Sequence, residues 1–451
     1  MGVDGLYKFI NKNLNDTFKL VSISEIKGKS CIIDGMQHIY SQLIYMRSRE
    51  KEVITKDGKN ISHIHGLINS LTYYLKNGII PIFIFDGKSP EIKKNKINER
   101  RKNLKENLNK LKELETLRNN MIEEFNNFDN DDNDDNDNDM IFGTPPSDLF
   151  NLEDELKKYN NIQEEYKKIY KKSIVLKDYF VSDWIEILEY LGLPVIKADG
   201  EADPICAYIS KNNYNIYGII SDDSDMLIFG APTLMRKSVN QQFIIIELKN
   251  LINNINILLY NIFEENKNFV FDNLLEFSLL LGTDYGNFRL NCNKIDSLEI
   301  LKFYVNNDMD FKKVISEDQY ELFYKIKDYY INNNYNEFDD YLEKPIWKKP
   351  DLFNLKQRLL QLNVDEDYID KNNEYFDLCF TKRGKYKRNK TRSYSFDNYI
   401  KRKENNENFN KEFYCKKFDQ INSIIKNNYK YNNREEEEKR IDSDEIFKLE
   451  D

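Results

Sequence analysis

The chain has 451 residues, enough for two or three domains or one large domain with insertions. Its net charge of −10, read over the whole chain, argues against nucleic acid as a partner. The charge is uneven, however: residues 130–139 are mostly acidic, whereas basic residues gather in 87–105 and 381–403. Because salt confines the field of each patch to its surroundings, an acidic chain with basic patches can still bind phosphates.

The five cysteines lie far apart in the sequence, and no close pair is typical of a disulfide framework or a zinc knuckle. We therefore expect reduced thiols in an intracellular protein that is not secreted. No apolar run is long enough to cross a bilayer, and the N-terminus lacks the apolar core of a signal peptide. We expect a monomer without membrane contact, in the nucleus or, for a viral protein, at a cytoplasmic replication site.

Four apolar runs along the chain each lead directly to acidic residues. The runs are 31–33, 79–85, 193–198 and 216–221, and the acids that follow them are Asp34, Asp86, Glu201 with Asp203, and Asp223 with Asp225. Helical patterns separate the runs, which predicts an α/β fold with a mostly parallel central sheet flanked by helices. Ligands of such sheets bind at the carboxyl ends of the strands, where these acids lie.

The segment between Asp86 and Glu201 has a different character. Leucines at steps of three and four over 93–125 predict one long, highly charged helix that projects from the sheet. The Asp/Asn tract at 129–139 is typical of disorder, and a second helix follows it. After Asp225, an apolar helix leads to Asp284, and helical patterns continue to about residue 380.

These patterns predict five regions in chain order. They are an N-terminal region at 1–108, an insertion at 109–172, an internal region with a helix-turn-helix-like segment at 173–300, a helical C-terminal region at 301–380, and a basic then acidic disordered tail at 381–451.

The seven acids at strand or helix ends predict a metal site. A single Asp after a strand is usually a helix N-cap, but E-x-D and D-x-D pairs in succession favour a shared site. Oxygen ligands without His or Cys suit hard ions, namely Mg²⁺ or, as a substitute, Mn²⁺. Two such ions would clamp the attacking and leaving oxygens of a phosphodiester. With only three His in the chain, a His-based hydrolytic site is not favoured.

Two basic residues near Asp86 are candidate catalytic groups. Lys93 and Arg100 are seven residues apart and lie on one face of the predicted helix, two turns from each other. From there they would reach the scissile phosphate and help to neutralise it. The alternative is that they belong to a solvated, charged helix face.

The order of these motifs resembles the flap endonuclease/xeroderma-G family of structure-specific nucleases. "MGVDGLYKFI", "IIDGMQHIY", "IFDGKSPEIKK", "GEADPICAYI", "ISDDSDMLIFG" and "LLGTDYG" carry the resemblance over residues 1–105 and about 175–290. The resemblance implies a PIN-like 5′ nuclease fold with a helical arch. It also implies that Asp34, Asp86, Glu201 and Asp203 hold a first ion, and that Asp223, Asp225 and Asp284 hold or share a second.

The same resemblance implies roles in DNA binding for further residues. Lys93 and Arg100 would lie at the base of the arch through which a 5′ end passes. Tyr40 falls where the family stacks an aromatic ring on an unpaired nucleotide, and the alternative for it is a helix-core tyrosine. Gly2 matches a small residue near the site, and Arg47 is a candidate phosphate contact.

This sequence departs from the family in three places. The interval from Asp86 to Glu201 is longer than in the flap-cutting members and includes the acidic tract, which puts threading of the 5′ end in doubt. The segment after Asp284 has only Gly286 where the family has a Gly-rich hairpin. In the tail, Phe396, Tyr399 and Ile400 have the spacing of a sliding-clamp box, but Ser393 stands where Gln is expected.

The resemblance and the acids together predict Mg²⁺-dependent hydrolysis of DNA at 5′ flaps, nicks or related junctions in replication and repair. Within the same family, a 5′–3′ exonuclease and a junction resolvase are alternatives, and a further alternative is an RNA-directed 5′ exonuclease. A catalytically inactive DNA-binding scaffold is the non-enzymatic alternative, although an unused acidic cluster would only cost stability.

Overall fold

The computed structural model describes residues 2–130, 146–213, 215–238, 242–288, 290, 296–332 and 347–390. The chain forms two compact units, Met1–Thr381 and Lys382–Asp451, and the fold below is that of the first unit. Two regions of interest lie outside the described residues: the acidic tract from 131 onward, and the predicted clamp-binding residues Phe396, Tyr399 and Ile400.

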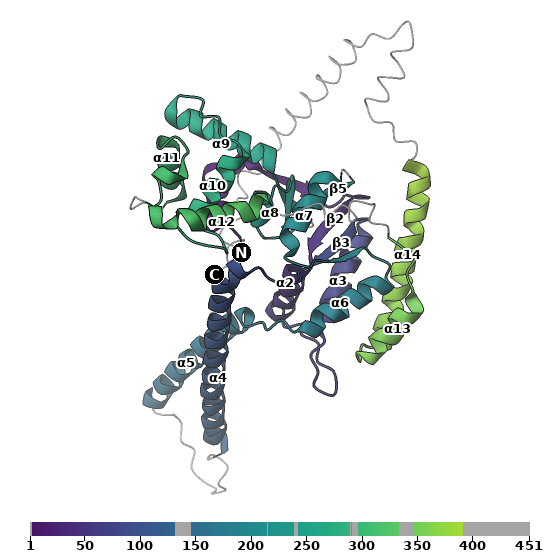
Figure 1. The fold of residues 1–451 in the computed structure, drawn as a ribbon. Coiled ribbons are helices and arrows are strands. Elements are labelled where there is room, and N and C mark those ends of the chain that lie inside the picture. Colours follow the sequence, from purple (N-terminus) through teal and green to yellow (C-terminus); the bar gives the residue numbers. More distant parts are fainter. Residues whose placement is uncertain are drawn as a thin grey trace, which may run out of the picture. The chain divides into compact units, whose positions relative to one another are not determined.

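A seven-stranded sheet of order β1-β7-β6-β5-β2-β3-β4 forms the centre of the unit (Figure 1). Its strands are β1 (Phe18–Ser22), β2 (Ser30–Asp34), β3 (Ile80–Phe85), β4 (Val195–Lys197), β5 (Ile216–Ile220), β6 (Thr233–Lys237) and β7 (Gln242–Glu247). Strands β6, β5, β2, β3 and β4 run parallel, which confirms the predicted mostly parallel sheet. The sequence reasoning did not include the edge, where β7 pairs antiparallel with both β1 and β6.

Side chains of the central strands alternate between two apolar layers. In β2, Ile32 faces one layer, and Cys31 and Ile33 face the other; in β3, Ile82 and Phe83 divide in the same way. Because both faces are covered, β3 is buried along its whole length and reads as a continuous apolar run. The sheet is therefore a rigid support whose carboxyl edge is free to carry polar groups.

Helices cover both faces of the sheet. They are α1 (Leu6–Asn13), α2 (Gly35–Ser48), α3 (Ser62–Lys76), α6 (Asp178–Tyr190), α7 (Ala202–Asn212), α8 (Asp225–Ile228), α9 (Leu248–Phe263), α10 (Phe271–Leu281), α11 (Ser297–Asn306), α12 (Tyr320–Ile331), α13 (Leu352–Gln361) and α14 (Glu366–Lys390). One layer contains α1, α7 and α9–α12, and the other contains α2, α3, α6, α13 and α14. Within the described segments, no helix is long and apolar enough to span a membrane.

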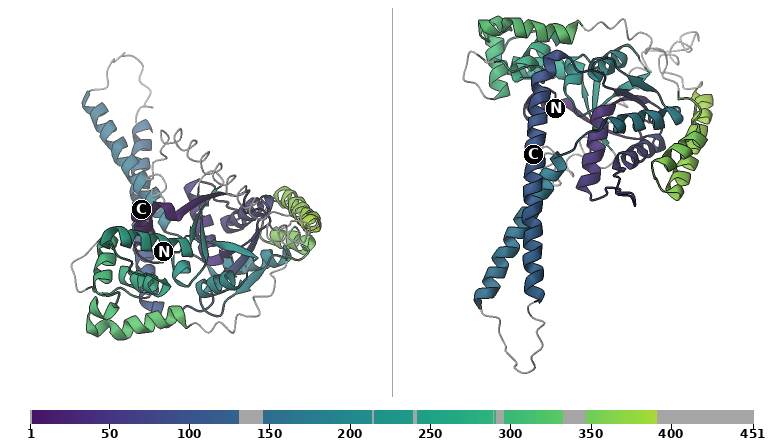
Figure 2. Two further views of the ribbon diagram at one scale, coloured as in Figure 1. Left: turned by 90° about the horizontal axis from the view of Figure 1, so that it is seen from above. Right: turned by 60° about the horizontal axis from the view of Figure 1, so that its bottom comes forward.

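The predicted long helix is α4 (Lys94–Asn130), and it packs along α5 (Pro146–Lys172) as a helical hairpin (Figure 2). Leu111 and Leu114 are buried in α4, although the helix is charged along most of its length. The ring of Tyr166 from α5 lies 5.0 Å from the guanidinium carbon of Arg118 in α4. The helix extends to Asn130, so the first two residues of the predicted disordered tract are helical.

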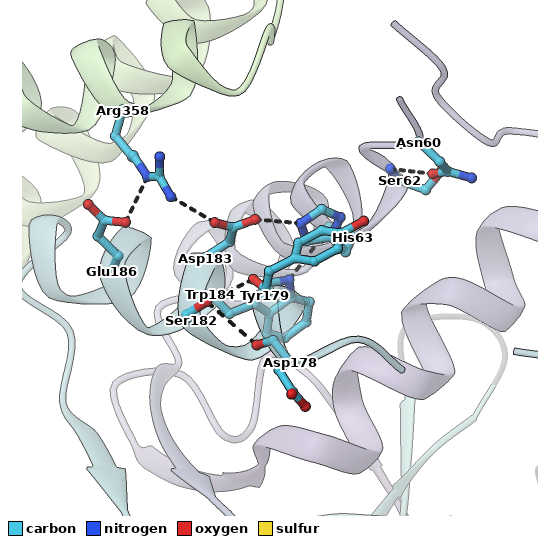
Figure 3. Close-up of polar contacts among 10 residues, drawn as sticks. All are labelled: Asn60, Ser62, His63, Asp178, Tyr179, Ser182, Asp183, Trp184, Glu186 and Arg358. Atoms are coloured by element: carbon cyan, nitrogen blue, oxygen red, sulfur yellow. Dashed lines mark hydrogen bonds and ion pairs between the residues drawn. The ribbon is translucent and has the colours of Figure 1, made fainter. Parts of the chain in front are cut away.

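A buried polar cluster attaches α13 to the helices beneath it (Figure 3). The carboxylate of Asp183 in α6 accepts from Arg358 of α13 at 2.8 Å and lies 3.0 Å from Nε2 of His63 in α3. Leu355 and Leu359 of α13 are buried beside this cluster. Residues of the predicted C-terminal helical region thus complete the core of the first unit.

Candidate active site

The strand topology brings the predicted acids to one edge of the sheet. Asp34 is the last residue of β2, and Asp86 follows β3. From the second half of the chain come Glu201 and Asp203 at the start of α7, Asp223 and Asp225 after β5, and Asp284 in the turn after α10. All are buried except Asp86 and Asp223, which are half-buried. The acids therefore lie near one another at this edge of the sheet, close enough for their charges to interact.

Backbone amides hold three of these carboxylates. Asp34 caps α2 by accepting from the Gln37 amide at 3.1 Å, and Asp86 accepts from the Ala202 amide at 2.7 Å. Asp223 accepts from the Asp225 amide at 2.9 Å. A cap and a ligand are thus not exclusive roles here, because each carboxylate has a second oxygen with free lone pairs.

Two glycines allow the close approach of these segments. Gly87 follows Asp86, and a Cβ there would lie 2.1 Å from the Ala198 carbonyl oxygen. Gly2 has a φ of 86°, and its Cβ would lie 2.2 Å from Oδ1 of Asp223. The Val3 amide donates to Oγ of Ser224 at 3.0 Å, which fixes the N-terminal segment against the acids. The structure thus places Gly2 beside the predicted site.

The two predicted catalytic cations lie among the acids. Lys93 donates to Oε1 of Glu201 at 2.5 Å, and Arg100 donates to Oδ2 of Asp284 at 2.5 Å. Burial alone would lower the pKa of Lys93, but the charges of Glu201 and Asp203 outweigh burial and raise it. Lys93 is nearly buried, whereas the Arg100 side chain is 44% exposed and can turn toward a ligand. Lys93 thus differs from a residue on a solvated helix face, and the catalytic roles of both side chains stay predictions.

Burial and mutual repulsion make the carboxylates hard to ionise together. Burial, followed by the charge of Asp86, raises the pKa of Asp34 to about 8. Burial also raises the pKa of Asp203 and Asp225 well above the usual range, and the charge of Asp223 adds to both shifts. Perturbed titration of this kind is typical of functional sites. A divalent cation would relieve this repulsion.

The donor set fits a hard divalent cation. Both carboxylate oxygens of Asp225 are buried, and neither has a hydrogen-bond partner within the described residues. In that same part of the chain, no three His, Cys, Asp or Glu side chains are close enough to enclose an ion. Lys93, Arg100 and the backbone amides hold several of the oxygens instead. The individual metal assignments therefore stay predictions.

The structure gives Arg47 and Tyr40 protein contacts. Arg47 donates through Nη1 to the carbonyls of Tyr170 at 2.8 Å and Ser173 at 2.9 Å, and it pairs with Glu52 at 3.2 Å. It thereby caps the end of α5. Tyr40 is half-buried against the core layer that contains α2 and α3. Their roles in DNA binding stay predictions.

Sequence reasoning missed two tyrosines at the site. The hydroxyls of Tyr285 and Tyr329 both donate to Oε2 of Glu201, at 2.5 and 2.8 Å. Tyr285 stands directly after Asp284, which could have drawn attention to it. Tyr329 lies 128 residues from Glu201 in α12, and with 30 tyrosines in the chain nothing local distinguishes it.

Two segments of the chain match models of known protein families. Residues 1–107 match the XPG N-terminal domain, and residues 192–284 match the XPG I-region. Both matches support the flap endonuclease/XPG family for this chain. All seven acids of the candidate site lie within these two segments, so the family resemblance and the carboxylate edge concern the same residues.

Individual members of the flap endonuclease/XPG family are distant relatives. Flap endonuclease 1 of Theileria parva is 24% identical over 347 residues, which cover 75% of this chain and 58% of that protein. Flap endonuclease 1 of Pyrococcus abyssi is 25% identical over 342 residues, or 74% of this chain and 83% of that protein. The chain spans only 58% and 57% of the two Theileria relatives.

A solved structure of the family shares the fold. The flap endonuclease 1 structure from Methanococcus jannaschii matches 81% of this chain and 97% of its own, with a TM-score of 0.51 and 19% identity. At this identity the likeness shows the fold alone, and it agrees with the predicted PIN-like α/β architecture.

Proposed function

We propose that this chain is a divalent-metal-dependent 5′ nuclease that hydrolyses phosphodiesters of branched DNA, such as 5′ flaps or nicks. The observation that carries the proposal is the meeting of seven buried or half-buried carboxylates with Lys93 and Arg100 at one sheet edge. The Theileria parva and Pyrococcus abyssi relatives are both named flap endonuclease 1, which supports the same reaction and substrate class. The products would carry a 5′ phosphate and a 3′ hydroxyl.

The proposed metal ligands divide into two sets along the edge. Asp34, Asp86, Glu201 and Asp203 would hold one ion, and Asp223, Asp225 and Asp284 would hold or share the other. When bound, Mg²⁺, or Mn²⁺ in its place, would make the attacking water easier to deprotonate and would offset negative charge on the reacting phosphate.

Lys93 and Arg100 would bind the scissile phosphate in this proposal. In the absence of substrate their charges are neutralised by Glu201 and Asp284, which keeps both side chains at the reacting edge. A phosphodiester that enters the site offers them new anionic partners, and the extra charge of the transition state strengthens those contacts. The two side chains therefore orient the phosphate and stabilise the charge that develops on it.

DNA binding itself would depend on phosphate contacts and on the shape of the junction. The affinity for DNA should fall as the salt concentration rises. Binding of the protein releases cations from the DNA, and this release is less favourable at high salt. Selectivity would come from the bend that a flap or nick allows, with little reading of base edges.

A metal titration on defined substrates tests the proposal. Purified protein is incubated with end-labelled 5′-flap, nicked, four-way and single-stranded DNA, and with a matched RNA flap, over a range of Mg²⁺ concentrations. We expect cleavage that requires the metal and prefers the 5′-flap or nicked substrate. Binding of junctions without cleavage at any metal concentration would contradict the proposal and favour the inactive scaffold.

A matched pair of variants in one loop tests the site assignment. Asp225→Ala should abolish cleavage and leave junction binding intact, because it removes a buried, unpartnered carboxylate. Asp222→Asn is the control, since Asp222 is exposed and pairs with Arg236 at 3.0 Å. Wild-type turnover in Asp225→Ala would overturn the assignment of Asp225 to the metal site.

A further inference from the structure

Helix α12 contributes a hydroxyl to the acidic edge from outside the two segments that match the family. The Tyr329 hydroxyl donates to Oε2 of Glu201 at 2.8 Å, and the Tyr285 hydroxyl donates to the same oxygen at 2.5 Å. The other oxygen, Oε1, accepts from Lys93 at 2.5 Å. Glu201 is therefore held at both oxygens by three donors from three separate segments.

The position of the Tyr329 hydroxyl is fixed by the packing of α12. Lys327, two residues earlier, donates to Glu276 of α10 at 2.6 Å, and Glu276 is itself buried. Phe323 and Ile326 of α12 are fully buried in the core layer. The ring of Tyr329 lies 5.0 Å from that of Tyr285. Because α12 is anchored on several sides, its hydroxyl can hold Glu201 in one orientation.

We propose that Tyr329, together with Tyr285, is a positioning residue that presents the Glu201 carboxylate to a divalent cation. The proposal rests on the proposed nuclease function. Each carboxylate oxygen has two lone pairs, so the two tyrosine hydroxyls occupy Oε2 and fix the rotation of the group, while Oε1, which accepts from Lys93, keeps one lone pair for an ion. Hydrogen-bond partners behind a ligand raise metal affinity in this way. Helix α12 is thus part of the catalytic unit.

The test compares two tyrosines that are adjacent on α12. Tyr329→Phe deletes the hydroxyl on Glu201, and Tyr330→Phe deletes a buried hydroxyl that has no carboxylate partner among the described residues. Binding of Mn²⁺ alone is measured by electron paramagnetic resonance without DNA. We expect about tenfold weaker binding in Tyr329→Phe and less than about twofold change in Tyr330→Phe.

Cleavage provides a second readout of the same pair. The Mg²⁺ concentration for half-maximal rate should rise about tenfold in Tyr329→Phe, while the rate at saturating Mg²⁺ stays within about threefold of wild type. A higher Mg²⁺ requirement with a nearly unchanged rate at saturating Mg²⁺ indicates weaker metal positioning. A general loss of folded protein would lower the saturated rate instead. If Tyr329→Phe does not fold, Tyr285→Phe removes the second hydroxyl from the same oxygen and gives the same comparison.

Three results would overturn the positioning role. They are unchanged Mn²⁺ binding in Tyr329→Phe, tighter Mn²⁺ binding in it, and equal weakening in both tyrosine variants. A wild-type protein that binds Mn²⁺ in a Tyr329-dependent way but cleaves no DNA would contradict the proposed function alone. The two proposals can therefore fail separately.

Discussion

Two groups of buried charge in this molecule differ in how completely their carboxylates are paired. In the cluster of Figure 3, one oxygen of Asp183 lies 3.0 Å from His63 and the other accepts from Arg358 at 2.8 Å. At the acidic edge, Asp225 is equally buried, yet neither of its oxygens has a partner among the described residues. Both oxygens of Asp183 are thus paired within the protein, whereas Lys93 and Arg100 pair with Glu201 and Asp284 and leave Asp225 without a partner.

This difference separates a structural site from a candidate catalytic one. The Asp183 cluster joins α3, α6 and α13, and the ring of Phe180 stacks on His63 at 4.3 Å. Pairing both oxygens of a buried carboxylate offsets much of the cost of removing it from water. Carboxylates left without partners lower stability unless a ligand supplies the missing charge. We therefore expect opposite effects on stability when charge is removed from the two sites.

The largest expected effect on stability comes from breaking the Asp183 cluster. Asp183→Ala leaves Arg358 with Glu186 alone and removes the carboxylate beside the buried His63, which should cost about 3–5 kcal/mol of unfolding free energy. Urea unfolding followed by circular dichroism measures this loss. Glu186→Ala is the control, because Glu186 also pairs with Arg358 but is more exposed, and it should cost at most about 1 kcal/mol. Similar losses in both variants would contradict the contrast.

At the acidic edge, the charge of Lys93 should contribute more to the rate of cleavage than to the affinity for DNA. Lys93→Met should slow single-turnover cleavage of a flap about 100-fold, or about 2.7 kcal/mol in the barrier, because a charge aimed at the phosphate is lost. DNA affinity should change by less than about threefold. Lys94→Met is the matched control, since Lys94 is exposed. An unchanged single-turnover rate in Lys93→Met would remove Lys93 from the site.

The metal-free acidic edge should make stability fall as pH rises. A carboxyl whose folded pKa is raised favours the folded state only while protonated, so its cost begins above the unfolded pKa of about 4. Because the pKa of Asp34 is raised to about 8, the loss should extend to about pH 8. Saturating Mg²⁺ should flatten this slope, which urea unfolding at several pH values would show.

Neutralising one carboxylate should have the same effect without metal. Asp225→Asn should raise metal-free stability at pH 8 by about 2 kcal/mol, because it removes one of the repelling buried charges. The variant should also show a shallower dependence of stability on pH. A destabilised variant, or a slope equal to that of wild type, would mean that repulsion at this edge is already relieved within the protein.

The candidate site was largely predictable because its acids follow local patterns. Asp34 and Asp86 each end a continuous apolar run, and parallel strands bring such ends to one edge. The pairing of β1 with β7 was not predicted, because it joins residues 18–22 to residues 242–247, and β1 has no clean alternation of buried and exposed positions. Long-range pairing of short edge strands leaves little trace in the sequence.

Residues that act through distant contacts were equally hard to predict. Arg47 carries the same charge whether it binds DNA phosphate or, as here, the carbonyls of Tyr170 and Ser173. Only the packing of α5 against α2 assigns its donors. The same holds for Asp183, whose partners His63 and Arg358 lie 120 and 175 residues away in the sequence. Chemistry at strand ends is a local property, whereas charge pairing in a core depends on the whole fold.

The smallest expected effect comes from two N-terminal glycines with similar backbones. Gly2 and Gly5 have φ values of 86° and 76°, so an alanine at either position should cost about 1 kcal/mol in backbone strain. A Cβ at Gly2 would lie 2.2 Å from Oδ1 of Asp223, whereas a Cβ at Gly5 would meet no atom within 4 Å. Only Gly2→Ala should therefore displace a proposed metal ligand. The Mg²⁺ requirement for cleavage should rise severalfold in Gly2→Ala and should match wild type in Gly5→Ala. Equal Mg²⁺ requirements in the two variants would show that the N-terminal segment does not support Asp223.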